Sequence, residues 1–324
     1  MPPRLLGFGS ALLDELAHVP EAFLAGVPGM KGGTELVDRA GGEELLKRLP
    51  SKPLQAPGGS AANTITGAAH LGLSCGMLAK VGADEAGDFY RATMRGAGID
   101  TGPFKISRSE PTGCCLSLIT PDSQRTMRTF LGAAATMSPD EITAADFVGY
   151  THLHSEGYQL FSKELMLRVL SLAKAAGLEI SLDLSAPEVV MATKSFLPEL
   201  LREYVTTVFA NEDEASAFAD GKGEEAGLDA LSKIVPVACV KLGVRGAVIR
   251  SGGKDVRVKA HVVKAVDTTG AGDLWAAGYL YGRLTGAEFA KAGDFGARTS
   301  AAVVQVTGAV IPPAEWQRLR TECR

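Results

Sequence analysis

The apolar residues of this chain gather in short runs that are separated by longer amphipathic segments. The runs predict β-strands at residues 5–9, 78–82, 150–154, 179–184, 207–210, 238–241 and 246–250. Segments with helical periodicity lie between most of them, among others at residues 84–97, 163–176 and 213–219. Because strands that alternate with helices are typical of an α/β fold, we expect a doubly wound, mostly parallel sheet with helices on both faces.

A different pattern interrupts this alternation between residues 112 and 130. Two strand-like runs, 112–120 and 124–130, flank the turn Pro121-Asp122-Ser123 and predict a β-hairpin. A hairpin joins antiparallel strands, so we expect this segment to be an antiparallel insertion in the parallel fold.

Two glycine-rich turns each lead into a predicted helix. One is Gly58-Gly59-Ser60-Ala61-Ala62-Asn63, and the other is Asp267-Thr268-Thr269-Gly270-Ala271-Gly272-Asp273, which follows a strand-like run at 262–266. In the second turn, Gly270 and Gly272 can adopt positive φ angles and let backbone N–H groups surround an anion. The positive N-terminal end of the helix adds to this effect, so the turn is a candidate anion-binding site.

Two aspartates are candidates for chemistry at these turns. A carboxylate beside a bound phosphate is electrostatically costly, so Asp273 is either a general base that accepts a proton from an attacking hydroxyl or an N-cap of the helix. Asp14 follows the first predicted strand, where ligands gather in open α/β sheets. An aspartate in a surface loop is the alternative for Asp14.

Composition narrows the class of partner. The 324 residues carry a formal net charge of -4, and the sequence pI is near 5.8. This charge gives no basic footprint for nucleic acid or for an anionic membrane, so small-molecule partners are favoured. No apolar run approaches bilayer length, and the first residues lack the apolar core of a signal peptide, which predicts a cytoplasmic protein.

Cysteine and histidine offer little evidence for a metal site. The five cysteines lack metal-ligand spacing and are expected to be buried free thiols. His152 and His154 alternate on a predicted strand and therefore share a face, where they could bind a metal or be hydrogen-bonded in the core. The absence of a third ligand nearby in the sequence favours hydrogen-bonded histidines.

With both glycine-rich turns in view, the chain resembles the ribokinase-like (PfkB) family of sugar and nucleoside kinases over essentially its full length. The turn from Gly58 to Asn63 is similar to the family's N-terminal signature, and the turn from Asp267 to Asp273 is similar to its C-terminal signature. Shorter strings, such as Pro111-Thr112-Gly113-Cys114 and Leu131-Gly132-Ala133-Ala134, resemble the adenosine kinase branch.

The resemblance implies an ATP-dependent kinase that phosphorylates a primary hydroxyl of a ribonucleoside, with adenosine converted to AMP. Asp273 would be the base, and Gly270, Ala271 and Gly272 would form the anion hole. A sugar kinase with a ribose- or fructose-type acceptor and a non-catalytic nucleotide-sensing protein are the alternatives. The expected partners are ATP and a small-molecule acceptor, without nucleic acid or membrane, in a monomer or homodimer.

The family pattern also assigns roles to individual residues. The implied acceptor-binding residues are Asp14, Gly58, Gly59, Asn63, Leu131, Ala133 and Tyr158. The implied nucleotide-binding residues are Asn211, Glu214, Lys241, Gly243, Gly246 and Thr268. Glu214 would hold Mg²⁺ through water. K⁺, which some members of the family bind, would be held by loop carbonyls near Asp267 and Thr269 and near the segment 303–308.

By the same resemblance, the hairpin and strands from about residues 13–37 would form a small β-sheet lid over the acceptor site. We expect a discontinuous lid of residues 14–40 and 104–131, and a large domain of residues 1–13, 41–103 and 132–324. Arg125 and Arg128 of the lid would either reach phosphate or substrate on closure or, as the favoured interpretation, stand as solvated charges. Ser10 departs from the family, where many members have Asn, so one polar contact to the substrate would differ.

Overall fold

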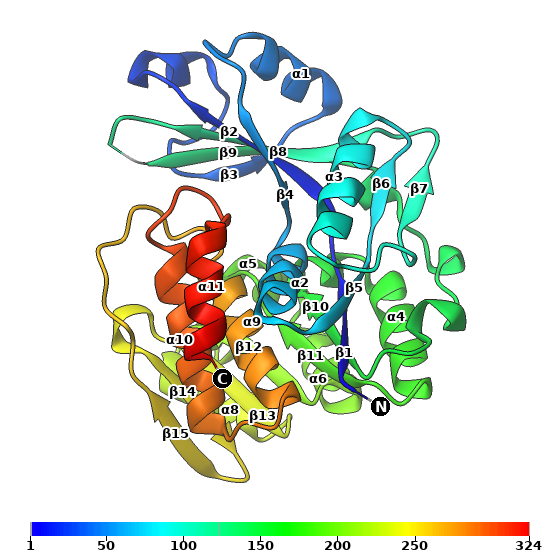
Figure 1. Ribbon diagram of the computed structural model, residues 1–324, viewed down its shortest axis with the longest axis vertical. Helices are drawn as coiled ribbons and strands as arrows, with labels where there is room; N and C mark the ends of the chain where they lie inside the picture. The colour runs from blue at the N-terminus through cyan, green and yellow to red at the C-terminus, as the bar shows by residue number, and fades with distance from the viewer. Residues whose placement is uncertain (1, 123, 324) are drawn as a thin grey trace.

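The computed structural model describes residues 2–122 and 124–323, and within them eight strands form one large sheet (Figure 1). Their spatial order is β15 (Lys254–Val258), β14 (Ala247–Ser251), β13 (Val237–Lys241), β12 (Thr207–Asn211), β11 (Glu179–Asp183), β10 (His152–Glu156), β1 (Arg4–Phe8) and β5 (Ser74–Leu78). The strands from β13 to β5 are parallel, and β14 and β15 extend one edge as antiparallel strands.

Both faces of this sheet are buried, because neighbouring residues of one strand enter different hydrophobic clusters. Leu6 packs into the cluster on one face and Leu5 into the cluster on the other. The first cluster is covered by α4 (Lys163–Ala175), α5 (Pro187–Thr193), α6 (Leu197–Tyr204), α7 (Glu212–Phe218) and α8 (Glu224–Ser232). The second is covered by α2 (Ser60–Leu71), α3 (Glu85–Gly96), α9 (Ala271–Leu284) and α10 (Phe289–Val303), with α11 (Pro313–Glu322) beyond them. The predicted doubly wound fold is confirmed.

A smaller five-stranded sheet, the lid, stands over one end of the large sheet at the top of Figure 1. Its order is β3 (Thr34–Leu36), β9 (Arg125–Gly132), β8 (Thr112–Ile119), β2 (Leu12–His18) and β4 (Leu54–Gly58), and α1 (Arg39–Lys47) lies beside it. The strands β8 and β9 pair antiparallel, which confirms the predicted hairpin, although Ser123 in its turn lies outside the described residues. A separate pair joins β6 (Lys80–Gly82) to β7 (Lys105–Ser107).

Three sequence predictions are corrected by this topology. Residues 262–266 form no strand, because no neighbouring strand pairs with them and Val262 is 77% exposed. The strand predicted at 78–82 is divided at Ala79, where the chain leaves β5 for β6. Asp14 lies within β2 of the lid rather than in a loop after β1, where its backbone pairs with Ala56 of β4.

The boundary predicted for the large domain also needs correction. The range 41–103 includes β4, which pairs antiparallel with β2 in the lid. In Figure 1 the chain then descends from β4 directly into α2 of the large domain. None of the helices in the described part of the chain is long and apolar enough to cross a membrane.

Candidate active site

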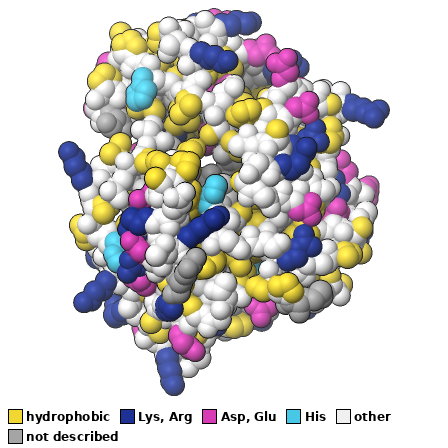
Figure 2. Space-filling view, viewed as in Figure 1, with side chains coloured by type: hydrophobic (Ala, Val, Ile, Leu, Met, Phe, Trp, Pro, Cys, Tyr) yellow, Lys and Arg dark blue, Asp and Glu magenta, His cyan; other side chains and the backbone are white. Residues whose placement is uncertain are grey.

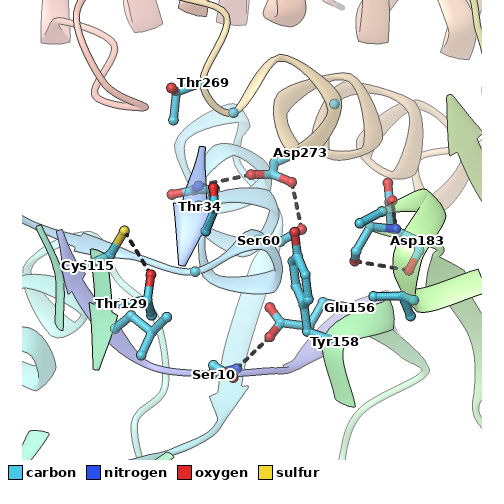
Figure 3. A pocket seen from close by; sticks show the side chains of 18 of the residues that line it. Ser10, Thr34, Ser60, Cys115, Thr129, Glu156, Tyr158, Asp183, Thr269 and Asp273 are labelled. Atoms are coloured by element: carbon cyan, nitrogen blue, oxygen red, sulfur yellow. Dashed lines mark hydrogen bonds between the residues drawn. The ribbon is translucent and has the colours of Figure 1, made fainter. Parts of the chain in front are cut away.

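A cavity of about 1290 Å³ lies between the lid and the carboxyl ends of the large-sheet strands. Four of its polar lining residues end four adjacent strands in turn, namely Glu156 of β10, Asp183 of β11, Asn211 of β12 and Lys241 of β13. The lid contributes residues from β2, β3, β8 and β9 on the opposite side, as Figure 3 shows for Thr34, Cys115 and Thr129. The cavity therefore sits where open α/β sheets bind ligands.

Asp273 is the third residue of α9, and its carboxylate faces the start of α2. Ser60 Oγ donates to one carboxylate oxygen at 2.7 Å, and Asn63 Nδ2 donates to the other at 2.9 Å (Figure 3). Burial raises the pKa of Asp273 to about 6 although these two donors lower it. The helix N-cap is Gly270 and has no side-chain cap, so the structure does not support the alternative of an N-capping aspartate.

The residues Gly270 to Gly272 form the candidate anion-binding turn before Asp273, which we call the anion cradle. Gly270 has a φ of 74°, in the left-handed region where glycine is favoured. Gly272 lies inside α9 without a positive φ, so of these two glycines Gly270 alone adopts the conformation that the sequence permits at both. Its missing side chain has another reason: a Cβ on Gly272 would lie 3.0 Å from Nζ of Lys241. N–H groups in the first turn of a helix lack intrahelical partners and can face an anion.

Asp14 enters the cavity from β2 of the lid. Burial raises its pKa to about 7; the charge of Arg125 lowers it, and that of Asp273 raises it. Gly58 packs behind Asp14, since a Cβ there would lie 2.2 Å from Cγ of the carboxylate. Gly58 therefore shapes the site without lining it, whereas Gly59, with a φ of 102°, does line the cavity.

Part of the cavity lining is apolar or aromatic. Leu131 and Tyr158, which the family pattern implies for the acceptor, line the cavity. Ala133 does not, because it is completely buried and its neighbours Ala134 and Ala135 line the cavity instead. Sequence reasoning missed Phe161, which also lines the cavity. This residue is 63% exposed and ends the short helix η5 (Gly157–Phe161), which also carries Tyr158.

The cavity lining also contains the residues that the family pattern implies for the nucleotide, which are Asn211, Glu214, Lys241, Gly243, Gly246 and Thr268. Asn211 and Glu214 form a capping box at the start of α7. Burial raises the pKa of Glu214 to about 7, with the charge of Asp183 acting in the same direction. Lys241 Nζ donates to Asp183 at 2.7 Å, a partner that sequence reasoning missed.

The lid arginines are not the solvated charges that were favoured from the sequence. Arg128 is 1% exposed and donates to the backbone carbonyls of Pro28, Gly33 and Met127, so it organises the loop before β3. Arg125 lines the cavity and pairs with Asp267 at 2.9 Å, which joins the lid to the loop that precedes the anion cradle.

Asp267 lies near the expected K⁺ site, where backbone carbonyls and not its side chain are the implied ligands. One carboxylate oxygen accepts hydrogen bonds from Thr269 N and Oγ1, and the other accepts them from Gly308 N and Arg125. Although burial would raise it, the donors at Gly308 and Thr269 hold the pKa of Asp267 below its usual range. These carboxylate oxygens are occupied by donors and do not fit the role of cation ligands.

Glu156 is hydrogen-bonded to three separate segments of the site, at Ser10, Ala61 and Gln159. Its role was not predicted from the sequence. One of its oxygens accepts from Ser10 N at 2.8 Å and the other from Ala61 N at 2.9 Å. Gln159 Nε2 donates both to this carboxylate and to Ser10 Oγ. Ser10, where many members of the family have Asn, is thus tied to the body of the site by its backbone and its hydroxyl (Figure 3).

The two strand histidines are core residues. His152 Nε2 and His154 Nδ1 are each hydrogen-bonded at 2.9 Å to the same hydroxyl oxygen, Ser181 Oγ. Burial lowers the pKa of His152 to about 3 and that of His154 to about 4. The described residues contain no group of three or more His, Cys, Asp and Glu side chains that could hold a metal, and all five cysteines are free.

Comparison with known proteins identifies the family. Residues 35–317 match the model of the pfkB family carbohydrate kinases. This chain belongs to the PfkB family. Its PfkB fold is closely similar to the crystal structure of adenosine kinase from Sinorhizobium meliloti, with a TM-score of 0.90 and 30% identity over 99% of this chain and 100% of that one.

Curated relatives of this PfkB kinase act on different acceptors. An adenosine kinase of Saccharomyces cerevisiae is 30% identical over 96% of this chain and 98% of its own length. A 5-dehydro-2-deoxygluconokinase of Shouchella clausii is also 30% identical, over 76% of this chain and 80% of its own length. The chain is therefore a phosphotransferase with an alcohol group as acceptor. PfkB kinases use ATP with Mg²⁺, so ATP and a small-molecule acceptor are its substrates.

Proposed function

We propose that this PfkB kinase phosphorylates the primary hydroxyl of a ribonucleoside, with adenosine as the preferred acceptor and AMP as the product. The observation that carries the proposal is a set of exposed apolar and aromatic side chains in the cavity lining, which we assign to the acceptor end and call the wall. Tyr158, Phe161 and Leu36 of the lid all line the cavity and are 48%, 63% and 68% exposed.

A purine ring suits such a wall because it is flat and largely apolar on its faces. Aromatic and aliphatic side chains bind such a surface by stacking and by removing it from water. A free sugar presents hydroxyl groups in most directions and would leave this wall without polar partners for them. The composition of the wall therefore supports a nucleoside over a sugar.

Asp14 and Asn63 line the same cavity and support binding of a ribose there. A carboxylate can accept hydrogen bonds from two neighbouring hydroxyls at once. A ribose held at Asp14 would direct its primary hydroxyl toward Asp273, whose orientation Ser60 and Asn63 fix. Gly58, by making room for Asp14, belongs to this arrangement.

In the reaction, the acceptor oxygen forms a bond to the terminal phosphorus of ATP while the bond from phosphorus to the ADP oxygen breaks. Asp273 takes the hydroxyl proton, and ADP leaves with the electron pair of the broken bond. The residues Gly270 to Gly272 stabilise the negative charge on the transferring group through the first turn of α9. Closure of the lid excludes water that would otherwise accept the phosphoryl group.

At the nucleotide end, Asn211 and Glu214 would hold Mg²⁺ largely through its waters. Mg²⁺ keeps several of its waters and binds substrate phosphates, so it needs few direct protein ligands. The ion supplies charge neutralisation on the phosphates when bound. A K⁺ ion near Asp267 and Thr269 would have to rest on backbone carbonyls, since the Asp267 side chain is occupied by donors.

A panel of acceptors tests the proposal. Purified protein with Mg·ATP is assayed for ADP formation and for phosphorylated product with adenosine, other ribonucleosides, ribose, fructose and 5-dehydro-2-deoxygluconate. We expect the highest kcat/KM for adenosine. Inert adenosine with an efficiently phosphorylated sugar would overturn the nucleoside assignment and favour a sugar kinase.

A variant of the wall separates the acceptor end from the rest of the enzyme. Phe161→Ser removes an exposed ring, and we expect it to raise KM for adenosine while leaving KM for ATP unchanged. Phe89→Ser is a matched control, because Phe89 is 41% exposed on α3 and is not part of the cavity lining. Equal kinetics of the two variants would contradict a role for the wall in acceptor binding.

A further inference from the structure

The charges around the cavity are strongly unbalanced. Among the described residues that line it, eight side chains are acidic and two, Arg125 and Lys241, are basic. Arg125 comes from the lid and is paired with Asp267. Among the described residues of the large domain, Lys241 is therefore the only basic side chain in the cavity lining. The site must accept the negative charge of a transferring phosphoryl group.

Lys241 is held in place rather than free to move in solvent. It ends β13, its side chain is 13% exposed, and its Nζ donates to Asp183, which is 6% exposed, at 2.7 Å. Burial alone would lower the pKa of Lys241, but Asp183 and Glu214 raise it above its ordinary value, so the ammonium stays charged. A charged, positioned ammonium costs little reorganisation when negative charge develops beside it.

The position of this ammonium relative to the anion cradle is the decisive observation. A Cβ built on Gly272 would lie 3.0 Å from Lys241 Nζ and 3.8 Å from Cε. The ammonium thus lies directly against the first turn of α9, where the N–H groups face an anion. The absence of a side chain at Gly272 allows this approach. Gly272 has no positive φ, so its backbone conformation does not explain why the residue is glycine.

We propose that Lys241 is a catalytic residue whose ammonium contacts the transferring phosphoryl group in the anion cradle and neutralises part of its charge. Lys241 gives up no proton in this step: the acceptor proton goes to Asp273, and the breaking bond's electrons go to ADP. Asp183 is a positioning residue that keeps the ammonium beside Gly272. This inference rests on phosphoryl transfer from ATP and not on which acceptor the enzyme uses.

Lys241→Met tests the proposal through turnover. We expect kcat with the productive acceptor to fall by about 10²-fold, as for the loss of one oxyanion-stabilising donor, with KM values changed less than about tenfold. Because the substitution leaves Asp183 buried without its partner, the double variant Lys241→Met with Asp183→Asn is made alongside it. A folded double variant whose kcat stays within about threefold of wild type would overturn the proposal.

A binding measurement makes the test independent of the acceptor. Mg·ADP with aluminium fluoride imitates the planar phosphoryl group during transfer, and calorimetry gives the gain in affinity that fluoride adds to Mg·ADP. We expect wild type to show this gain and the double variant to lose it while still binding Mg·ADP. If adenosine fails as acceptor but this result holds, the acceptor assignment fails and the role of Lys241 stands. An undiminished gain in the double variant would refute that role.

Loss of the Lys241 charge should also change the pH profile, because this charge acts on the base. The charge of Lys241 lowers the pKa of Asp273, so its loss should move the acidic limb of kcat to higher pH, and Asp183→Asn should move that limb to lower pH. Arg245→Met is the matched control, because it removes a cation from the same turn but its side chain is 55% exposed and pairs with Glu212 and Glu224. A similar shift in Arg245→Met would count against the specific role of Lys241.

Discussion

The carboxylate of Asp273 combines two properties that a general base needs. Ser60 and Asn63 each donate to a different oxygen, which fixes the orientation of the group. Burial keeps its pKa at about 6, well above that of an ordinary aspartate. The group is therefore ionised at neutral pH and still basic enough to take a proton from a hydroxyl as the phosphoryl group is transferred.

Replacement of Asp273 by Asn should remove this proton acceptor while keeping the shape of the side chain. We expect kcat to fall by about 10²- to 10⁴-fold and the affinity for Mg·ADP to change little. Initial rates and calorimetry measure the two effects. Ser60→Ala, which removes one donor and leaves the carboxylate, should show a smaller loss; wild-type turnover in Asp273→Asn would refute the base assignment.

The pH dependence of turnover should follow the ionisation of Asp273. The base must be deprotonated, so kcat should rise with pH through about 6 and level off above it. Because the Ser60 hydrogen bond lowers the pKa of Asp273, Ser60→Ala should move this rise to higher pH. Rates measured from pH 5 to 9 at saturating substrates check both statements, and a rise that is insensitive to Ser60→Ala would contradict them.

Residues of the site could be predicted from the sequence where they belong to a motif. Their contacts with residues far away in the sequence could not. Asp273 and Gly270 stand in a recognisable turn. Ser60 acts through a carboxylate 213 positions away, and Glu156 acts through Ser10, 146 positions away. Although Ser60 stands in a recognisable turn, no local pattern shows which distant group it or Glu156 contacts, because the fold alone brings these partners together.

At the scale of elements, α9 is packed between α2 and α10 at very close range. A Cβ on Gly278 of α9 would lie 2.5 Å from the carbonyl oxygen of Phe295 in α10. A Cβ on Gly67 of α2 would lie 2.6 Å from Leu274 of α9. Glycines at these crossings let the helix that carries Asp273 sit against both neighbours, which fixes the base relative to the sheet.

Gly278→Ala should therefore destabilise the fold by about 1–3 kcal/mol, because the added methyl group meets backbone that cannot move away. Gly96→Ala is the control: Gly96 ends α3, nothing lies within 4 Å of its Cβ position, and alanine should be neutral or stabilise by up to about 1 kcal/mol. Denaturant unfolding measures both changes. Equal stabilities would contradict the packing argument.

The elements themselves were predicted best where both faces of a strand are buried. The strands from β10 to β14 were recognised because each contains a short apolar run. The edge strand β4 was missed because Pro57 and Gly58 read as a loop, although proline is compatible with a sheet edge. The run at 262–266 has strand-forming residues but no partner, and pairing is what stabilises a strand.

At the scale of the whole molecule, the lid is joined to the large domain by a partly buried ion pair. The side chains of Arg125 and Asp267 are 10% and 9% exposed. On the outer face in Figure 2, by contrast, positive and negative side chains are interspersed over the surface. The charge imbalance of the cavity and the partly buried ion pair between lid and large domain thus differ from the mixed charges of the face in Figure 2.

Arg125→Gln should weaken this contact and admit water to the cavity. We expect the rate of phosphorylation to fall and the ratio of ADP formed to acceptor phosphorylated to rise above one, because water then competes for the phosphoryl group. Quantifying both products in one reaction gives the ratio. Arg108→Gln, at an exposed position outside the cavity, is the control, and a ratio that stays at one in both variants would contradict a sealing role for Arg125.

The carboxylate of Glu156 lies where the chain enters and leaves the lid, since it holds Ser10 ahead of β2 and Ala61 at the start of α2. The strand β2 carries Asp14, and α2 carries both donors to Asp273. Because Glu156 is hydrogen-bonded to both segments, a tilt of β2 should also shift the start of α2. An acceptor that seats badly against Asp14 will leave the base misaligned, so the enzyme will reject a wrong acceptor in kcat as well as in KM.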